Sequence, residues 1–511
     1  MTSIVTSENS IKTSSKVIGK NINISIPFTI VIISFLFRIC CIGSHDLLVE
    51  EAYYWNYAQH LDFSYLDHPP MVALLIKAST LVFGINEFGI RIPALLCWLL
   101  AALFSYKWTE LISRGSGQYA VMILSLLPFF FLQSLVTTPD QPLLLCWSAA
   151  LYYLYRTLVL DESNYWYVAG IWLGFGLLSK YTIILLAPSV LLYMIVVPSA
   201  RHWFFRKESY VCVLIAALFF TPVIYWNAIH EWASFAFQST RRFQSVANFS
   251  FHYFIGLLIL FLLPSGMIGL WNLFNKKSLV SAHLDQKTQR FLQIFTLFPL
   301  VFFGAFSFSH PINLDWIGPG LLALIPWLAI LITKSKKTRT TWFVGGVFVL
   351  LCYSVIIGAI TFGAPEKISQ KLFKNLISWE KLTEQVYVVA KNIEDTTNST
   401  PIIIPLDAYR IGSELAFYQT KFLAKGTIPK IYPIIGRHIF GTDSLMYRYW
   451  SQGEDLSGKT LILISTQPED FDAPALTEKV IVLSPSHGLW SYSQGRGVPI
   501  TRYYYEVVKM G

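Results

Sequence analysis

The segment TWFVGGVFVLLCYSVIIGAIT, residues 341–361, contains no charged side chain along its whole length. A helix needs about 20 apolar residues to cross the hydrocarbon core of a bilayer, so this segment is long enough to span a membrane. The whole chain of 511 residues is 54% hydrophobic and only 14% charged, with a mean hydropathy of +0.50. These values are far from those of soluble proteins and indicate a polytopic membrane protein.

Similar apolar runs recur along the first 360 residues, after a Ser/Thr/Lys-rich segment, 1–21, that is predicted to be a cytoplasmic tail. Eleven spans are predicted, and the helix-like stretch 71–84 is re-entrant, interfacial or a further span. The predicted fold class is therefore mainly α, with about 11–13 transmembrane helices between residues 22 and 361. The predicted spans are 22–42, 92–110, 118–136, 141–158, 165–179, 181–198, 210–228, 251–272, 291–308, 316–333 and 341–361.

The distribution of Lys and Arg predicts the orientation, because short loops rich in these residues stay in the cytoplasm. With the N-terminus inside, the cytoplasmic side receives Lys12, Lys16, Lys20, Lys107, Arg114, Arg156, Arg201, Arg206, Lys207, Lys276, Lys277, Lys287, Arg290, Lys334, Lys336, Lys337 and Arg339. The opposite loops are poor in cations. The net charge of +9 thus reflects topology, with a minor contribution from anionic lipid, and requires no nucleic-acid partner.

The six cysteines all fall in predicted spans, so they are interpreted as small packing residues and not as disulfides or metal ligands. They are Cys40, Cys41, Cys97, Cys146, Cys212 and Cys352.

An odd number of spans places the C-terminal part of the chain outside the cytoplasm. There, TPIIIPLDAY, KTLILIST and EKVIVLSP are short β-branched runs that alternate with helix-like stretches such as 412–420. This pattern predicts an extracytoplasmic α/β domain over residues 380–511, after a linker at 362–379.

The first outer loop contains VEEAYYWNYAQHLDFSYLDHPPM, residues 49–71. Its adjacent acids, Glu50 and Glu51, lie among aromatic side chains, where partial burial would raise a carboxylate pKa and suit one of them to accept a proton from a sugar or lipid hydroxyl. Two solvated loop charges are the simpler alternative. Asp67 and His68 in the same loop favour a site, and the sequence leaves open which glutamate would be the base.

Two further polar groups fall on the same face. Asp140, in TTPDQP at 137–142, is the expected N-cap of the following helix. Lys180 lies at the outer end of the fifth span. Its spacing slightly favours a side chain that extends along the membrane surface and places its ammonium in solvent. The alternative is a buried ammonium, which would need an anionic partner.

The fourth and fifth outer loops are also unusual in composition. Arg241 and Arg242 break the orientation rule, which suggests that they meet a negative ligand such as a lipid phosphate. The segment SHPINLDWIGPG, 309–320, has proline and glycine as expected of a turn, but a turn alone does not explain its other residues, His310, Asn313, Asp315 and Trp316.

The order of these motifs resembles the bacterial branch of the dolichyl-phosphate-mannose protein mannosyltransferase superfamily, which includes the lipid A aminoarabinose transferases. The motifs are acid-acid-Ala-Tyr-Tyr-Trp, Asp-His-Pro-Pro, Thr-Pro-Asp, Gly-Leu-Leu-Ser-Lys-Tyr, Trp-Ala-Ser-Phe-Ala-Phe-Gln and His-Pro-Ile-Asn-Leu-Asp-Trp. The resemblance covers about residues 20–360. It implies the GT-C fold in a bacterial inner membrane and inverting transfer of a sugar from a polyprenyl-phosphate donor to a periplasmic acceptor, with lipid A or another lipopolysaccharide or envelope glycan expected.

The resemblance also implies residue roles. Glu50 takes the place of a catalytic Asp, Asp140 matches a second-loop Asp, and Lys180 matches a Lys near the lipid phosphate. His68 replaces a Lys in a Lys-Pro-Pro segment, which suggests a different donor sugar or subfamily. The donor phosphate would be held by His68, Lys180, Arg241 and Arg242, and the substrate cavity would include Tyr53, Tyr54, Trp55, Asp67, His310, Asn313 and Trp316.

No cofactor is expected with certainty. A Glu-His pair of the aminoarabinose branch appears here as Gln238-Ser239, so the sequence supports at most an optional divalent cation. Two alternatives remain: a protein O-mannosyltransferase and a transporter or flippase of lipid-linked sugars. Transporters usually contain internal repeats, and none is found; nor does any motif for a nucleotide-sugar site occur in the chain.

Overall fold

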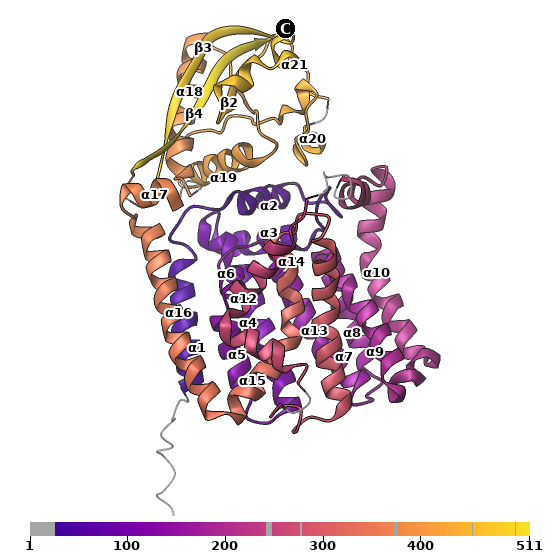
Figure 1. Cartoon of the computed structure of the whole chain (residues 1–511). Coiled ribbons are helices and arrows are strands. Elements are labelled where there is room, and N and C mark those ends of the chain that lie inside the picture. The colour runs from indigo at the N-terminus through magenta and orange to yellow at the C-terminus, as the bar shows by residue number, and fades with distance from the viewer. Residues whose placement is uncertain (1–25, 242–247, 276–277, 373–375, 452, 496) are drawn as a thin grey trace, which may run out of the picture.

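The computed structural model describes residues 26–511 except 242–247, 276–277, 373–375, 452 and 496, so the predicted tail lies outside the described residues. The described chain forms a tall helical body with a smaller α/β domain stacked on one end (Figure 1). Among the described residues, those from 26 to 362 form the helical body, and the C-terminal residues form the smaller domain.

In its described residues each of the eleven predicted spans contains a helix, although several helices are shorter than predicted or broken. The helices are Ile26–Cys41 (α1), Glu87–Ile112 (α4), Gly117–Leu126 (α5) followed by Pro128–Gln133 (α6), Asp140–Leu158 (α7), Tyr165–Ser179 (α8), Leu186–Val196 (α9), Lys207–Ile229 (α10), Phe251–Asn272 (α12), Gln286–Phe306 (α13), Ile325–Lys334 (α15) and Lys336–Phe362 (α16).

Proline explains several of the breaks, because it removes a backbone donor and clashes with the preceding turn. Pro128 separates α5 from α6, and Pro264 follows a non-helical Leu263 inside α12. Six helices in the described part of the chain are long and apolar enough to cross a membrane, or seven if the pair bent by 118° at Tyr181–Val196 and Pro198–Phe205 is one span. The chain is therefore a multi-pass membrane protein.

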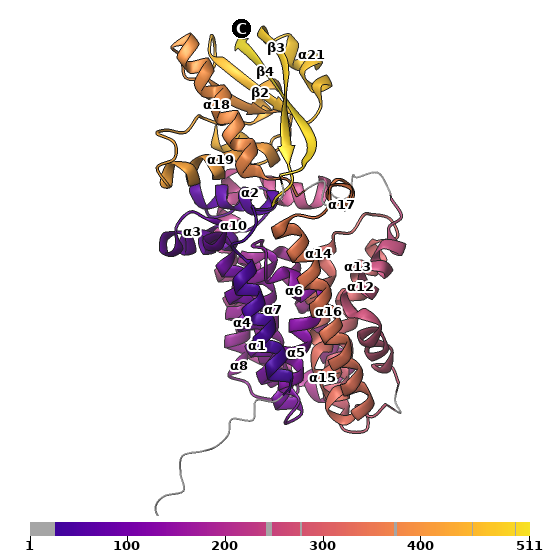
Figure 2. The same ribbon diagram turned by 90° about the vertical axis from the view of Figure 1, so that its left-hand side faces the viewer.

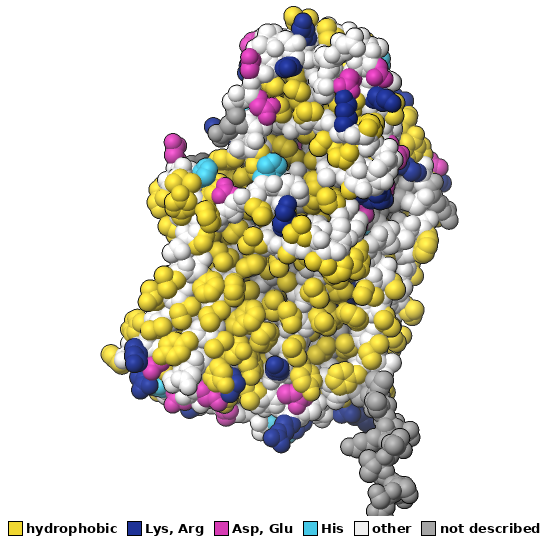
Figure 3. All heavy atoms as spheres, turned by 180° about the vertical axis from the view of Figure 1, so that it is seen from behind, with side chains coloured by type: hydrophobic (Ala, Val, Ile, Leu, Met, Phe, Trp, Pro, Cys, Tyr) yellow, Lys and Arg dark blue, Asp and Glu magenta, His cyan; other side chains and the backbone are white. Residues whose placement is uncertain are grey.

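The lateral surface of the helical body is apolar. Figure 3 shows a broad hydrophobic band across one face of it, with charged side chains at the end of this face away from the C-terminal domain. Only 6% of the apolar window of α16 is buried, so this helix is a lipid-facing element. The connection between α15 and α16, with the predicted cytoplasmic cations Lys334 and Lys336, lies at that lower end (Figure 1).

Two helices lie across the opposite end of the bundle, beneath the C-terminal domain (Figure 2). Val49–Gln59 (α2) contains both candidate glutamates, and Met71–Phe83 (α3) matches the uncertain stretch 71–84. Residues 49–59 of the first outer loop are thus helical, contrary to their interpretation as part of a loop, whereas the helix-like stretch 71–84 is confirmed as a helix. The aromatic residues of 49–59 are buried on several sides of α2, which gives no amphipathic period that would have revealed the helix.

The C-terminal domain contains the predicted α/β elements. Its sheet has the order β1-β2-β4-β3, built from Ile402–Pro405 (β1), Thr460–Ser465 (β2), Val480–Tyr492 (β3) and Pro499–Met510 (β4). β1 and β2 are parallel, and the other two pairs are antiparallel. The main helices are Trp379–Thr397 (α18) and Arg410–Ala424 (α19). The three predicted strands are confirmed, whereas β4 was not predicted.

The interface between the two bodies is a shared hydrophobic core. Trp55 of α2 meets Phe417 of α19 edge to face, with 5.3 Å between ring centroids. The ring centroids of Tyr53 and Tyr409 are 4.6 Å apart. α2 is therefore packed between the bundle and the C-terminal domain, and this arrangement orients its acidic first turn.

Candidate active site between the membrane bundle and the C-terminal domain

The two adjacent glutamates of α2 have different environments. Glu51 is fully buried and pairs with Arg91 of α4, whose Nη2 lies 2.7 Å from Oε2 and whose Nε lies 2.9 Å from Oε1. The backbone N–H groups of Leu48 and Thr137 also donate to the Glu51 carboxylate, at 2.9 and 3.0 Å. This carboxylate is saturated with donors, so its geometry is that of a structural ion pair.

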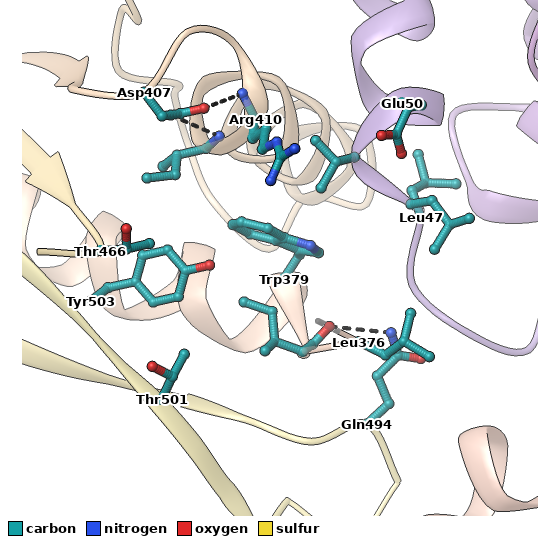
Figure 4. Close-up of a pocket in the computed structure, with 14 residues that line it drawn as sticks. Leu47, Glu50, Leu376, Trp379, Asp407, Arg410, Thr466, Gln494, Thr501 and Tyr503 are labelled. Atoms are coloured by element: carbon teal, nitrogen blue, oxygen red, sulfur yellow. Dashed lines mark hydrogen bonds between the residues drawn. The ribbon is translucent and has the colours of Figure 1, made fainter. Parts of the chain in front are cut away.

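Glu50, by contrast, is exposed in the first turn of α2 and lines a cavity below the C-terminal domain (Figure 4). Tyr54, four residues further along α2, is buried against Tyr57 and His68. Tyr54 lies near the carboxylates of Asp67 and Asp140. The geometry therefore favours Glu50 over Glu51 as a base, and the catalytic role itself stays a prediction.

Asp140 and Lys180 form a buried ion pair. The Lys180 Nζ lies 2.8 Å from Asp140 Oδ1 and 3.0 Å from Oδ2, and it also donates to the Asp315 carboxylate. The prediction that Asp140 caps its helix is wrong, because Pro139 is the N-cap and no side-chain cap bond forms. Asp140 is the first helical residue, and its carboxylate turns toward the lysine instead.

The favoured interpretation of Lys180 as a surface-seeking ammonium is also wrong, since the residue is only 6% exposed. Its side chain joins the start of α7, the end of α8 and the short helix Leu314–Ile317 (α14). Two carboxylates face one ammonium, so the triad carries a net negative charge when both are ionised. An anionic ligand at Lys180 would therefore need an exchange of these pairs or an additional cation.

The Asp67-His68 motif lies close to this triad. His68 interacts electrostatically with Asp315 and meets Tyr54 edge to face, with centroids 5.6 Å apart. The Tyr57 hydroxyl donates to the Asp67 carboxylate. The Gln238 side-chain amide, from the fourth outer loop, donates to the Asp67 carbonyl oxygen at 2.5 Å. Segments far apart in the sequence thus meet around loop one, as a single site requires.

Other candidate residues point elsewhere or lack a described side chain. Tyr53 and Trp55 pack against the C-terminal domain, as described above. His310 and Trp316 pack on Phe306 of α13, with centroid distances of 4.6 and 5.7 Å, and Asn313 is exposed. The side chain of Arg241 and all of Arg242 lie outside the described residues, so their phosphate-binding role stays a prediction.

Sequence reasoning missed Arg91, Tyr409 and Arg410 as parts of this region. A single arginine directly before the apolar run 92–110 was a usable signal, because such a charge at a membrane boundary needs a partner. Tyr409 and Arg410 carried no such signal, because their proximity to α2 follows only from docking of the C-terminal domain. Burial, together with the carboxylates of Glu50 and Asp67, raises the pKa of Tyr409, so that residue lies near both acids.

One group of three acids in the described chain has the spacing of a metal site: oxygens of Asp46, Glu87 and Glu380 lie within 4.8 Å of one another. The Lys421 ammonium donates to Glu87 at 2.6 Å and to Glu380 at 3.4 Å. The ammonium offsets one negative charge of this group, whose members come from both bodies. The optional divalent cation stays a prediction.

Comparison with solved structures defines the fold class. The chain is similar to ArnT from Cupriavidus metallidurans in the apo state, with a TM-score of 0.61, 14% identity, and coverage of 94% of this chain and 97% of that one. ArnT bound to undecaprenyl phosphate gives a TM-score of 0.60, 13% identity and the same coverage. The chain therefore has the GT-C fold, as the motif resemblance implied.

Sequence comparisons point in the same direction. Residues 67–226 match the family model described as dolichyl-phosphate-mannose-protein mannosyltransferase. Lipid A galacturonosyltransferase RgtD from Rhizobium johnstonii is 27% identical over 207 residues, which is 40% of this chain and 42% of that relative. The aligned part thus spans about two fifths of the relative's length.

Proposed function

We propose that this protein is an integral-membrane, inverting glycosyltransferase that moves a sugar from a polyprenyl-phosphate donor to lipid A or another envelope glycan. The observation that carries the proposal is the exposed Glu50 carboxylate, held at the boundary between the bundle and the C-terminal domain by its buried neighbour Glu51. The described relatives support the donor class, since ArnT has been solved with undecaprenyl phosphate. RgtD, named for lipid A galacturonosyl transfer, supports the acceptor class.

In the proposed reaction, Glu50 accepts the proton of an acceptor hydroxyl. The acceptor oxygen attacks the anomeric carbon from the side opposite the phosphate, forming a new glycosidic bond with inversion. The bond between the anomeric carbon and the phosphate oxygen breaks, and polyprenyl phosphate leaves with its electron pair. The charge that grows on this leaving group requires cations nearby.

The triad around Lys180 and the neighbouring His68 are the proposed phosphate side of the site. Lys180 lies between Asp140 and Asp315, so its positive charge partly neutralises these two carboxylates before a phosphate binds. His68 can donate a hydrogen bond in its neutral form and adds a charge when protonated. Arg241 and Arg242 are proposed to complete the phosphate contacts.

The proposed orientation places the active site and the C-terminus in the periplasm. The end of the bundle opposite the C-terminal domain carries the cation-rich loops, in agreement with the orientation rule. The same arrangement would allow a protein acceptor, which the family description favours.

Mass spectrometry of lipid A, lipopolysaccharide core and periplasmic glycoproteins tests the acceptor directly, in cells with and without the protein. The proposal expects one sugar to be missing from lipid A or from another envelope glycan in the deletion strain and restored by the wild-type gene. Loss of a sugar from periplasmic proteins alone would assign the enzyme to protein modification, and identical glycans in both strains would contradict a transferase.

A further inference from the structure

A cavity of about 480 Å³ lies between the beginning of α2 and the C-terminal domain (Figure 4). This volume is typical of sites that bind small molecules. Glu50 lines it from the membrane body, and Arg410, Trp379 and Tyr503 line it from the C-terminal domain. Because each body supplies part of the wall, the cavity exists only in the docked protein.

The wall offers the groups that a sugar ring needs. Trp379 and Tyr503 are in edge contact, with centroids 5.8 Å apart; they are only 5% and 7% exposed, and the small aromatic surface that lines the cavity can pack against the apolar face of a sugar. The hydroxyl groups of Thr466 and Thr501 lie on the same wall and can exchange hydrogen bonds with sugar hydroxyls. A purely hydrocarbon ligand would leave these polar groups unsatisfied.

The charged side chains of the cavity favour a ligand that carries a negative charge. Asp407 accepts hydrogen bonds from the backbone N–H groups of Arg410 and Ile411, at 2.5 and 3.2 Å, so its carboxylate is engaged at the start of α19. The Arg410 guanidinium extends into the space toward Glu50 (Figure 4). Within the part of the chain that the structure describes, no carboxylate oxygen lies within 4.0 Å of a guanidinium nitrogen of Arg410.

We propose that this cavity is the acceptor site and that it selects a saccharide carrying a phosphate or carboxylate group. The anionic group would contact the Arg410 guanidinium, the ring would pack against Trp379 and Tyr503, and the reacting hydroxyl would face Glu50. The inference rests on the proposed function for the role of Glu50, but binding in the cavity does not require transfer to occur. The Lys180 triad would remain on the donor side.

Binding without donor tests the site separately from catalysis. The full chain in lipid nanodiscs is titrated by calorimetry with a bisphosphorylated glucosamine disaccharide, the deacylated backbone of lipid A, and with the same disaccharide lacking phosphate. Tighter binding of the bisphosphate is expected. Arg410→Ala should weaken it about 10- to 100-fold, as loss of a charged hydrogen bond implies, and Arg410→Lys should weaken it less. Undecaprenyl phosphate binding should stay unchanged in both variants.

Arg502→Ala is the matched control, because neighbouring residues on a strand face opposite sides and Arg502 lies over the Trp490 ring outside the cavity. Thr501→Tyr, at an exposed position on the wall, should block the disaccharide by filling space. Glu50→Gln should still bind it, so a wrong base assignment would appear as transfer retained by this variant and would leave the binding result unaffected. Equal affinity for both disaccharides, or wild-type affinity in both Arg410→Ala and Thr501→Tyr, would overturn the proposal.

Discussion

Glu50 and Glu51 show how one residue step changes the chemistry of a carboxylate. Both are adjacent acids in an aromatic segment, and the sequence left open which of them would be the base. The structure separates them because Glu51 points at Arg91 inside the bundle, whereas Glu50 points into the interdomain cavity. An ion pair buried on both sides is costly to break, since the remaining charge has no solvent to compensate it.

Arg91→Met should therefore destabilise the protein strongly. Removing one partner of a buried pair typically costs about 3–5 kcal/mol, and here it would leave the Glu51 carboxylate buried with only backbone donors. Thermal unfolding of the purified protein should show a large fall in midpoint. Arg114→Met, which removes an exposed arginine, serves as the control. Equal midpoints in the two variants would show that the Glu51–Arg91 pair does not support the fold.

At the scale of elements, the Lys180 triad ties together α7, α8 and α14. Lys180→Met would leave Asp140 and Asp315 as neighbouring carboxylates without their shared cation. Undecaprenyl phosphate affinity should fall about 10-fold or more, as expected for loss of a charged contact. Adding Asp140→Asn should restore part of it, because one negative charge is then removed.

Direct binding of undecaprenyl phosphate to the two variants and to wild type provides this test. An unchanged affinity in Lys180→Met would place the phosphate site away from the triad. An affinity that stays low in the double variant would mean that the ammonium contacts the phosphate and does more than balance the acids.

The elements differ in how far they could be predicted. The spans were predictable because a long uncharged apolar run has one main solution in a bilayer. β4, PITRYYYEVVKM, was missed because Arg502, Glu506 and Lys509 interrupt its apolar residues and proline starts it. α2 was missed because its aromatic residues are buried both against the bundle and against the C-terminal domain. The site residues of loop one were visible as motifs, but their partners were set by tertiary packing.

At the scale of the whole molecule, a buried polar layer joins the two bodies. Glu414 of α19 is fully buried, and within the described chain neither of its carboxylate oxygens has a hydrogen-bond partner. Burial raises its pKa well above the usual 4.5; the nearby acids Asp46, Glu51 and Glu50 add to the effect, and Arg91 opposes it. A protonated Glu414 is therefore favoured in the docked protein.

Glu414→Gln should make the fold less sensitive to pH. Above pH 4.5 the unfolded state loses this proton while the folded state keeps it, so folding stability should fall by about 1.4 kcal/mol per pH unit up to the raised pKa. The glutamine variant has no proton to lose at this position, so its stability should not fall with pH for this reason. Its thermal midpoint should exceed that of wild type at pH 8 and approach it near pH 4.5.

Glu384→Gln, at an exposed position of α18, is the control and should follow wild type at both pH values. A Glu414→Gln variant with the same midpoint as wild type at pH 8 would show that burial of Glu414 does not lower the folding stability of the protein at this pH.

The central claim is that Glu50 is the base of a sugar transfer that uses a polyprenyl-phosphate donor. It is tested most directly by transfer of labelled sugar from a panel of undecaprenyl-phosphate sugars, galacturonic acid included, to lipid A. Wild type and Glu384→Gln should transfer at least one sugar. Glu50→Gln should lower turnover about 100- to 10,000-fold and leave undecaprenyl phosphate affinity unchanged. Transfer by Glu50→Gln within a few-fold of wild type would contradict the account.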